Sequence, residues 1–196
     1  MTRDQILPRR FYVRDTLQVA EDLLGKRLVR VKGRWRMMGK IVEVEAYKGG
    51  EDPASHAFRG VTRRNAPMFA DGGHAYVYFT YGNHHCLNVT TEPSGTPGAV
   101  LIRALQPLSG LQWMRRLRPA VSDVELTNGP GKLTKALGID MTLNEVDMTK
   151  RGSLYIIDSE SDEKLQVKHS VRVGIRHGTN RLWRVYVSNN SFVSRR

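Results

Sequence analysis

One short run, Ile41–Tyr47, constrains the fold of this chain more than any other. Its even-numbered positions are valine or alanine, whereas its odd-numbered positions include Glu43, Glu45 and Tyr47. Side chains alternate between the two faces of a β-strand, so the run predicts a strand with one core-facing side and two acids on the other. Acids held in such an apolar run either neutralise a nearby arginine or carry out proton chemistry. The choice between these roles separates an enzyme from a binding protein.

The chain also carries a large excess of positive charge. Its 196 residues include 31 Lys and Arg against 19 Asp and Glu, which gives a net charge of +12 at pH 7. This excess favours a polyanionic partner, either nucleic acid or an anionic membrane face, although charge can also serve solubility alone. No apolar run reaches about 18 residues, so we expect no membrane attachment and a nucleic-acid partner.

Length and cysteine content bound the architecture and the compartment. The length suits one domain over residues 1–196 with a full hydrophobic core. Cys86 is the single cysteine, which excludes a disulfide within the chain and favours a reducing compartment. The N-terminal segment lacks the apolar stretch of a signal peptide. We therefore expect a cytoplasmic, nucleoid-associated protein, and the basic surface of a single domain favours a monomer.

Hydrophobic periodicity and turn residues predict strands and helices without regular alternation. Helices are expected at 16–24, 108–117 and 132–137, and strands at 28–31, 35–47, 75–81, 84–90, 100–105, 154–157, 171–173 and 183–187. Residues 48–74 and the charged segment 158–169 are expected to form loops. This order predicts one α+β domain with a largely antiparallel sheet.

A hairpin is expected around Gly82-Asn83, because this dipeptide suits a two-residue turn between strands. Tyr76 and Tyr78 lie on its first strand, where aromatic rings commonly pack into a core. Tyr81 lies beside the tip, where a large ring is seldom buried. On a basic protein such a ring could wedge between base pairs and hold open the gap left by an extruded nucleotide.

Histidines and a cysteine gather near the same hairpin, at His74 and His84–Cys86. Neighbouring strand residues point to opposite faces, so His84, His85 and Cys86 cannot all converge on one ion. We therefore expect no metal site here.

The segment Asn128–Thr134 superficially matches a nucleotide phosphate loop. That motif requires glycine at the position of Leu126 and serine or threonine at that of Leu133, and it fails at both. What remains is either a plain loop before a helix or a helix N-terminus that holds one backbone phosphate beside Lys132.

The acid pair itself is compatible with hydrolysis. Residues two apart on a strand lie roughly 6.6 Å apart along the chain, which suits two carboxyls that flank a glycosidic bond with a water between them. One acid would then activate water. The same spacing is common on strands that have no catalytic role.

Several ordered blocks resemble the alkyladenine (3-methyladenine) DNA glycosylase family. The resemblance covers nearly the whole chain from about residue 8 onward. The blocks are Glu43–Tyr47, Glu51–His56, Thr62-x-Arg64-Asn65-x-x-Met68-Phe69, Tyr76–Gly82 running on to Cys86–Asn88, Val100–Leu105, Gly129-Pro130-x-Lys132-Leu133 and Arg172–Ile175.

The resemblance implies a function and a role for individual residues. It implies a monofunctional enzyme that flips alkylated or deaminated purines out of duplex DNA and hydrolyses the N-glycosidic bond, without metal or other cofactor. It also implies a curved sheet with a protruding hairpin. Glu45 would be the general base that activates water, and Arg103 would hold that water and the carboxylate. The remaining roles fall to a base pocket of Tyr47, His56, Tyr78 and Asn88, a wedge at Tyr81, and backbone contacts from Arg64 and Lys132.

Two points stand against a simple transfer of these roles. The hairpin tip has Asn83, His84 and His85, where the family often has apolar or aromatic residues. A strict two-residue turn would place Tyr78 and Asn88 on opposite faces, although the resemblance needs both at the pocket. A bulge or a longer loop would reconcile them, so we expect irregular pairing between residues 78 and 88.

Two other functions compete with the glycosylase. A non-catalytic nucleic-acid binding module would use the tyrosines as stacking platforms, with Glu45 as an ordinary salt-bridge acid. A metal-dependent nuclease would lose its activity in chelator. For Glu43 we favour a structural ion pair with a local arginine over a second catalytic role.

Overall fold

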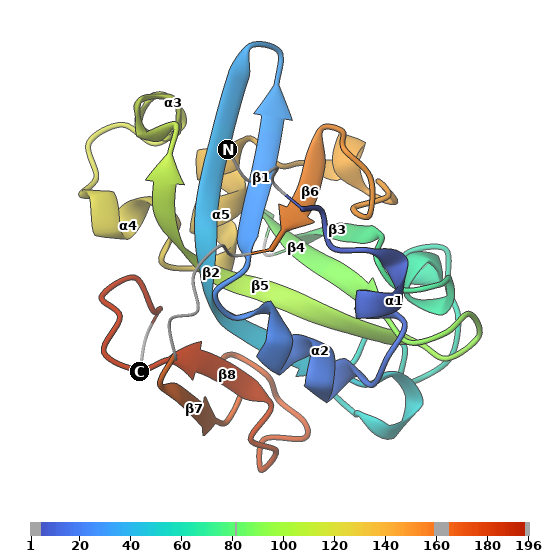
Figure 1. Cartoon of the computed structure of the whole chain (residues 1–196). Coiled ribbons are helices and arrows are strands. Elements are labelled where there is room, and N and C mark those ends of the chain that lie inside the picture. The colour runs from blue at the N-terminus through green and yellow to red at the C-terminus, as the bar shows by residue number, and fades with distance from the viewer. Residues whose placement is uncertain (1–4, 81, 159–164, 195–196) are drawn as a thin grey trace.

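The computed structural model describes residues 5–80, 82–158 and 165–194. Within these residues one eight-stranded sheet organises the chain, and helices pack around it (Figure 1). The strands are β1 (Arg27–Lys32), β2 (Trp35–Tyr47), β3 (Ala75–Thr80), β4 (His84–Thr91), β5 (Gly98–Ser109), β6 (Leu154–Ile157), β7 (Val167–Ser170) and β8 (Arg184–Val187). The α-helices are α1 (Arg9–Tyr12), α2 (Thr16–Leu23), α3 (Leu111–Leu117), α4 (Asp123–Thr127) and α5 (Pro130–Leu137), and 3₁₀ turns occupy Gly49–Glu51, Ala66–Phe69 and Met141–Leu143.

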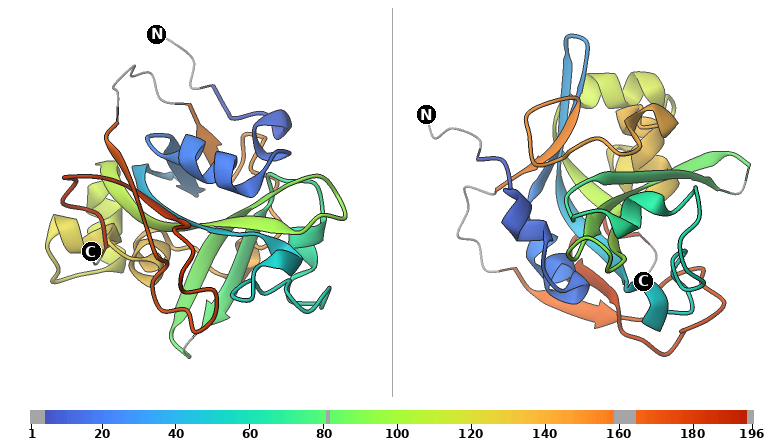
Figure 2. Two further views of the ribbon diagram at one scale, coloured as in Figure 1. Left: turned by 90° about the horizontal axis from the view of Figure 1, so that it is seen from below. Right: turned by 90° about the vertical axis from the view of Figure 1, so that its right-hand side faces the viewer.

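Strand β2 is the central strand of the sheet and pairs with three others. Along the order β3-β4-β5-β2-β1-β6 it pairs antiparallel with β5 on one side. On its other side it pairs with β1 through its first half and with β8 at Glu43–Glu45. Because two different strands share that edge, the sheet curls, and β8 with β7 folds away from β1 (Figures 1 and 2). The fold is therefore α+β with a curved antiparallel sheet, as expected.

The alternation in β2 produces the predicted division of faces. Val42, Val44 and Ala46 are fully buried in the main hydrophobic core. Helix α2 packs on this face against β2 and β5, and its N-terminus is capped by the Asp15 carboxylate, which accepts hydrogen bonds from two backbone N–H groups. Glu43, Glu45 and Tyr47 lie on the opposite face of β2.

Several predicted elements are confirmed and others are wrong. The bounds of β2 and β6 coincide with the expected strands, and α2 and α5 lie where helices were expected. The strand expected at 171–173 is wrong: the strand lies at Val167–Ser170, because those residues pair with β8. Residues 108 and 109 belong to β5 rather than to the following helix, since the β2 pairing extends to Ser109. The loop expected at 158–169 is wrong at its end, because residues 167–169 belong to β7, and its residues 159–164 lie outside the described residues.

The β3–β4 hairpin has a different register from the expected one. Tyr78 pairs with Cys86 and Thr80 with His84, so the connection is one residue longer than a two-residue turn. The pairing from Ala75 to Thr80 is regular, and the expected irregularity is wrong. The longer loop alone changes the register by one residue and places Tyr78 and Asn88 on the same face. The hairpin projects from the body of the protein (Figure 2).

Candidate active site

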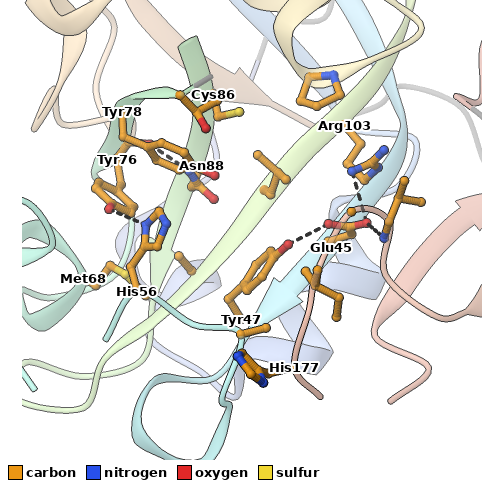
Figure 3. Close-up of a pocket in the computed structure, with 18 of the residues that line it drawn as sticks. Glu45, Tyr47, His56, Met68, Tyr76, Tyr78, Cys86, Asn88, Arg103 and His177 are labelled. Carbon is orange, nitrogen blue, oxygen red and sulfur yellow. Dashed lines mark hydrogen bonds and ion pairs between the residues drawn. The ribbon is translucent and has the colours of Figure 1, made fainter. Parts of the chain in front are cut away.

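A cavity of about 320 Å³ lies on the polar face of the sheet, where β2, β3, β4 and β5 meet. Alternate residues of these strands point into it, and loop residues close its rim. In Figure 3, Glu45 and Arg103 lie at one side, Tyr76, Tyr78 and His56 lie at the other, and Tyr47 stands between them. The lining includes Glu45, Tyr47, His56, Met68, Tyr76, Tyr78, Cys86, Asn88, Leu101, Arg103 and Val173.

Glu45 has a fully buried carboxylate with a partner on each oxygen. Oε1 accepts a hydrogen bond of 2.7 Å from the backbone N–H of Val173 and lies 3.1 Å from Nη1 of Arg103. Oε2 accepts a hydrogen bond of 2.8 Å from the hydroxyl of Tyr47. These contacts fix the carboxylate in one orientation at the cavity.

The Glu45 carboxylate contributes to raised pKa values of Arg103 and Tyr47. Burial alone would lower the pKa of Arg103, but the charges of Glu45 and Glu43 raise it above its usual value. Burial, together with the neighbouring Glu45, raises the pKa of Tyr47 well above its usual value. The tyrosine hydroxyl therefore remains protonated and donates its hydrogen bond at neutral pH.

Aromatic rings form the opposite wall. The ring centres of His56 and Tyr78 lie 4.6 Å apart, and those of Tyr76 and Tyr78 lie 5.4 Å apart. The Tyr76 hydroxyl and Nδ1 of His56 are 2.8 Å apart. Desolvation and then the Arg64 charge lower the pKa of His56 to about 4. The imidazole is therefore neutral at pH 7 and can either donate or accept a hydrogen bond.

Arginine guanidiniums lie over the rings of two pocket tyrosines. The guanidinium of Arg64 lies 5.0 Å from the Tyr78 ring centre, and that of Arg172 lies 4.7 Å from the Tyr47 ring centre. Such cation–π contacts restrict the rings. The two tyrosines are thus held as rigid walls around the cavity.

Hairpin residues complete the pocket. Nδ2 of Asn88 donates a hydrogen bond of 3.0 Å to the carbonyl of Tyr76, which fixes the amide on the pocket face. Cys86 is a buried free cysteine beside Tyr78, and burial raises the pKa of its thiol. Cys86 is therefore a neutral thiol at pH 7 and a poor nucleophile.

The structure brings most of the predicted site residues together. Glu45, Tyr47, His56, Tyr78, Asn88 and Arg103 all line this one cavity. Arg64 is placed over Tyr78, and Lys132 lies in the first turn of α5, where its Nζ donates a hydrogen bond of 2.8 Å to Asn128. The intercalation prediction for Tyr81 falls outside the described residues.

Glu43 occupies a different environment from Glu45. Its buried carboxylate does not line the cavity, and Oε1 accepts hydrogen bonds from Nε of Arg103 at 2.8 Å and Nε of Arg184 at 2.7 Å. Burial alone would raise the pKa of Glu43, but these two arginines hold it below its usual range. This is the arginine ion pair that we favoured for Glu43.

Sequence reasoning missed several residues that support the site. The Val173 N–H and the Arg172 side chain come from a segment that we expected to be a strand, and Arg184 and Ser194 contact Glu43 across 141 and 151 residues. The sole signal was the position of Arg172 and Val173 in a family-like block. No short-range pattern predicts contacts at such separations.

No group of three or more His, Cys, Asp and Glu side chains among the described residues is arranged to hold a metal ion. No helix in the described part of the chain is both long and apolar enough to cross a membrane.

A carboxylate fixed beside an aromatic-walled cavity on a basic chain suits a hydrolase that acts on a flat aromatic base of nucleic acid. A family model described as methylpurine-DNA glycosylase (MPG) matches residues 10–191. The chain therefore belongs to the methylpurine-DNA glycosylase family. It is a DNA glycosylase, which hydrolyses N-glycosidic bonds in base excision repair.

Relatives along nearly the whole chain agree with this family. A protein of Carboxydothermus hydrogenoformans is 48% identical over 191 residues, which cover 97% of this chain and 100% of the relative. A protein of Methanocella arvoryzae is 46% identical over 195 residues, with 97% and 96% covered. Both are named "Putative 3-methyladenine DNA glycosylase".

Proposed function

We propose that this chain flips alkylated or deaminated purines out of duplex DNA and hydrolyses their N-glycosidic bond, leaving an abasic site. The observation that carries the proposal is the buried Glu45 carboxylate, paired with Arg103 and facing a cavity of about 320 Å³ with tyrosine walls. The names of the relatives support a methylated purine such as 3-methyladenine as one substrate.

Hydrolysis assigns separate tasks to the two charged groups. The Glu45 carboxylate accepts a proton from the attacking water as the bond between deoxyribose and purine breaks. Arg103 holds the carboxylate and the water in place, and the negative carboxylate stabilises the positive charge that develops on the sugar. Alkylation at a ring nitrogen makes the base cationic, so it departs readily. A neutral lesion such as hypoxanthine requires protonation as it leaves.

Base selection rests on the walls of the pocket. Tyr47 and Tyr78 stack on the extruded purine, and the neutral His56 forms a hydrogen bond with its edge. We assign the Asn88 amide to the edge of the purine where guanine would carry its exocyclic amine, so that it would disfavour normal guanine. Damaged or mispaired bases are also easier to extrude, because they cost less to unstack.

Double-stranded DNA carrying a damaged purine is the proposed partner. Arg64 and Lys132 contact backbone phosphates, and Tyr81 fills the gap left by the flipped nucleotide. We propose that the chain acts as a monomer, as one glycosylase domain over residues 1–196, and in the cytoplasm with the nucleoid.

The central test is Glu45→Gln with duplexes that each carry one defined lesion. Wild type should leave alkali-labile abasic sites, also in chelator, whereas Glu45→Gln should bind the duplex but release no base. Glu21→Gln on the exposed part of α2 is the matched control and should retain the wild-type rate. Base release at the normal rate by Glu45→Gln would overturn the mechanism, and DNA binding without base release by wild type would favour the binding module.

Tyr81→Ala tests the wedge separately. It should weaken binding to lesion-containing duplex more than binding to undamaged duplex, because a wedge acts only when a nucleotide is extruded. Equal losses on the two duplexes would contradict the wedge.

A further inference from the structure

Glu43 lies two residues before Glu45 on β2. It is fully buried and does not line the cavity. Its carboxylate joins three separate parts of the chain. Oε1 accepts from Arg103 on β5 and from Arg184 on β8, and Oε2 accepts a hydrogen bond of 2.6 Å from the backbone N–H of Ser194. A carboxylate with this many fixed donors is an anchoring point for whatever it contacts.

Ser194 completes a closed ring of hydrogen bonds around one edge of Arg103. The Ser194 hydroxyl donates a hydrogen bond of 2.8 Å to Oε1 of Glu43. It accepts a hydrogen bond of 3.2 Å from Nη2 of Arg103. Nε of Arg103 donates a hydrogen bond of 2.8 Å to the same Glu43 oxygen. Two nitrogens of the guanidinium are therefore held by Glu43 and Ser194.

The third nitrogen of Arg103 faces the proposed catalytic carboxylate. Nη1 lies 3.1 Å from Oε1 of Glu45. A guanidinium is planar and rigid, so fixing Nε and Nη2 also fixes the direction of Nη1. The orientation of Arg103 toward Glu45, a contact visible in Figure 3, is thus set by Glu43 and Ser194, which do not line the cavity.

We infer that Glu43 and Ser194 are positioning residues for base excision, which hold Arg103 in its productive orientation against Glu45. The inference rests on the function proposed above. It assigns a catalytic purpose to the C-terminal segment, which closes the ring around Arg103 through Ser194. Arg184 balances the remaining charge, so that two carboxylates face two guanidiniums in this cluster.

A purely structural ion pair would have different consequences. Removing it would lower the stability of the protein but leave the folded enzyme with normal chemistry. Positioning instead predicts slow base release by a folded protein that still binds its lesion, because small displacements of a catalytic group can cost up to about a hundredfold in rate.

The test uses single-turnover base release from a duplex with one lesion, together with the dissociation constant for that duplex. Ser194→Ala removes the hydroxyl but keeps the backbone N–H that contacts Glu43, and Ser194→Thr keeps the hydroxyl. We expect the rate to fall about tenfold in Ser194→Ala and further in Glu43→Gln. The dissociation constants should stay within about twofold of wild type, and Ser194→Thr should recover most of the rate. Ser170→Ala is the matched control, because its hydroxyl accepts from Nη1 of Arg184 at 3.1 Å and does not contact Arg103.

The outcomes separate this inference from the proposed function. Wild-type rates of base release in both Ser194→Ala and Glu43→Gln would overturn the positioning role while base excision stands. A Ser194→Thr variant as slow as Ser194→Ala would exclude the hydroxyl as the cause. Failure of wild type to release any base, or normal release by Glu45→Gln, would instead overturn the proposed function.

Discussion

Asp52 and Arg172 form a completely buried ion pair behind the Tyr47 wall of the pocket. The guanidinium donates to the two carboxylate oxygens at 2.5 and 2.7 Å. It also lies 4.7 Å from the Tyr47 ring centre and 5.1 Å from that of Trp183. Asp52 therefore fixes Arg172, and Arg172 fixes the ring that faces the cavity.

Asp52→Ala should destabilise the protein strongly. Removing one partner of a buried pair leaves an uncompensated charge, so the free energy of unfolding should fall by about 3–5 kcal/mol in urea denaturation. Asp123→Ala breaks the exposed ion pair with Arg115 and should change the free energy of unfolding little. Similar losses in the two variants would contradict the importance of burial.

Tyr47→Phe should slow base release without weakening lesion binding. The ring and its contact with Arg172 remain, but Oε2 of Glu45 loses the hydroxyl that donates to it at 2.8 Å. A hydrogen bond to a charged group contributes about 1.5 kcal/mol, which corresponds to roughly a tenfold lower single-turnover rate. An unchanged rate would show that this bond does not orient the carboxylate.

Acidification should destabilise the fold through His56. Its pKa is lowered to about 4 in the folded protein, against about 6.5 when unfolded. Between these values the unfolded chain binds the proton more readily, so His56 contributes stability above pH 6.5 that is lost as the pH falls toward 4. His56→Gln should therefore lose less stability than wild type between pH 7 and pH 5 in urea denaturation. Equal losses of stability in His56→Gln and wild type would contradict the prediction.

Salt dependence tests the proposed phosphate contacts of Arg64 and Lys132. Each contact that is removed should reduce the slope of log affinity against log salt by about 0.9. Arg64→Gln and Lys132→Gln should each show this change in fluorescence-anisotropy titrations with undamaged duplex. An unchanged slope for Arg64→Gln would mean that its guanidinium stays on the Tyr78 ring when DNA binds.

Much of the fold could be predicted, because it depends on local patterns. The alternation in Ile41–Tyr47 predicted both the strand and its buried apolar face, and Asp15 predicted the start of α2. The hairpin register could not be predicted, because one additional loop residue is enough to move every side chain to the other face. Tyr78 and Asn88 share the pocket for that reason.

The sequence by itself determined the residues that face each side of β2, the basic charge of the chain and the family blocks that contain Glu45, Tyr47 and Arg103. Tertiary structure decided how the two acids differ, because their neighbours come from segments far away along the chain. Glu43 contacts Arg184 and Ser194 outside the cavity lining, whereas Glu45 contacts Val173 at the cavity. Nearly identical local sequences therefore hold one anchoring carboxylate and one that faces the pocket.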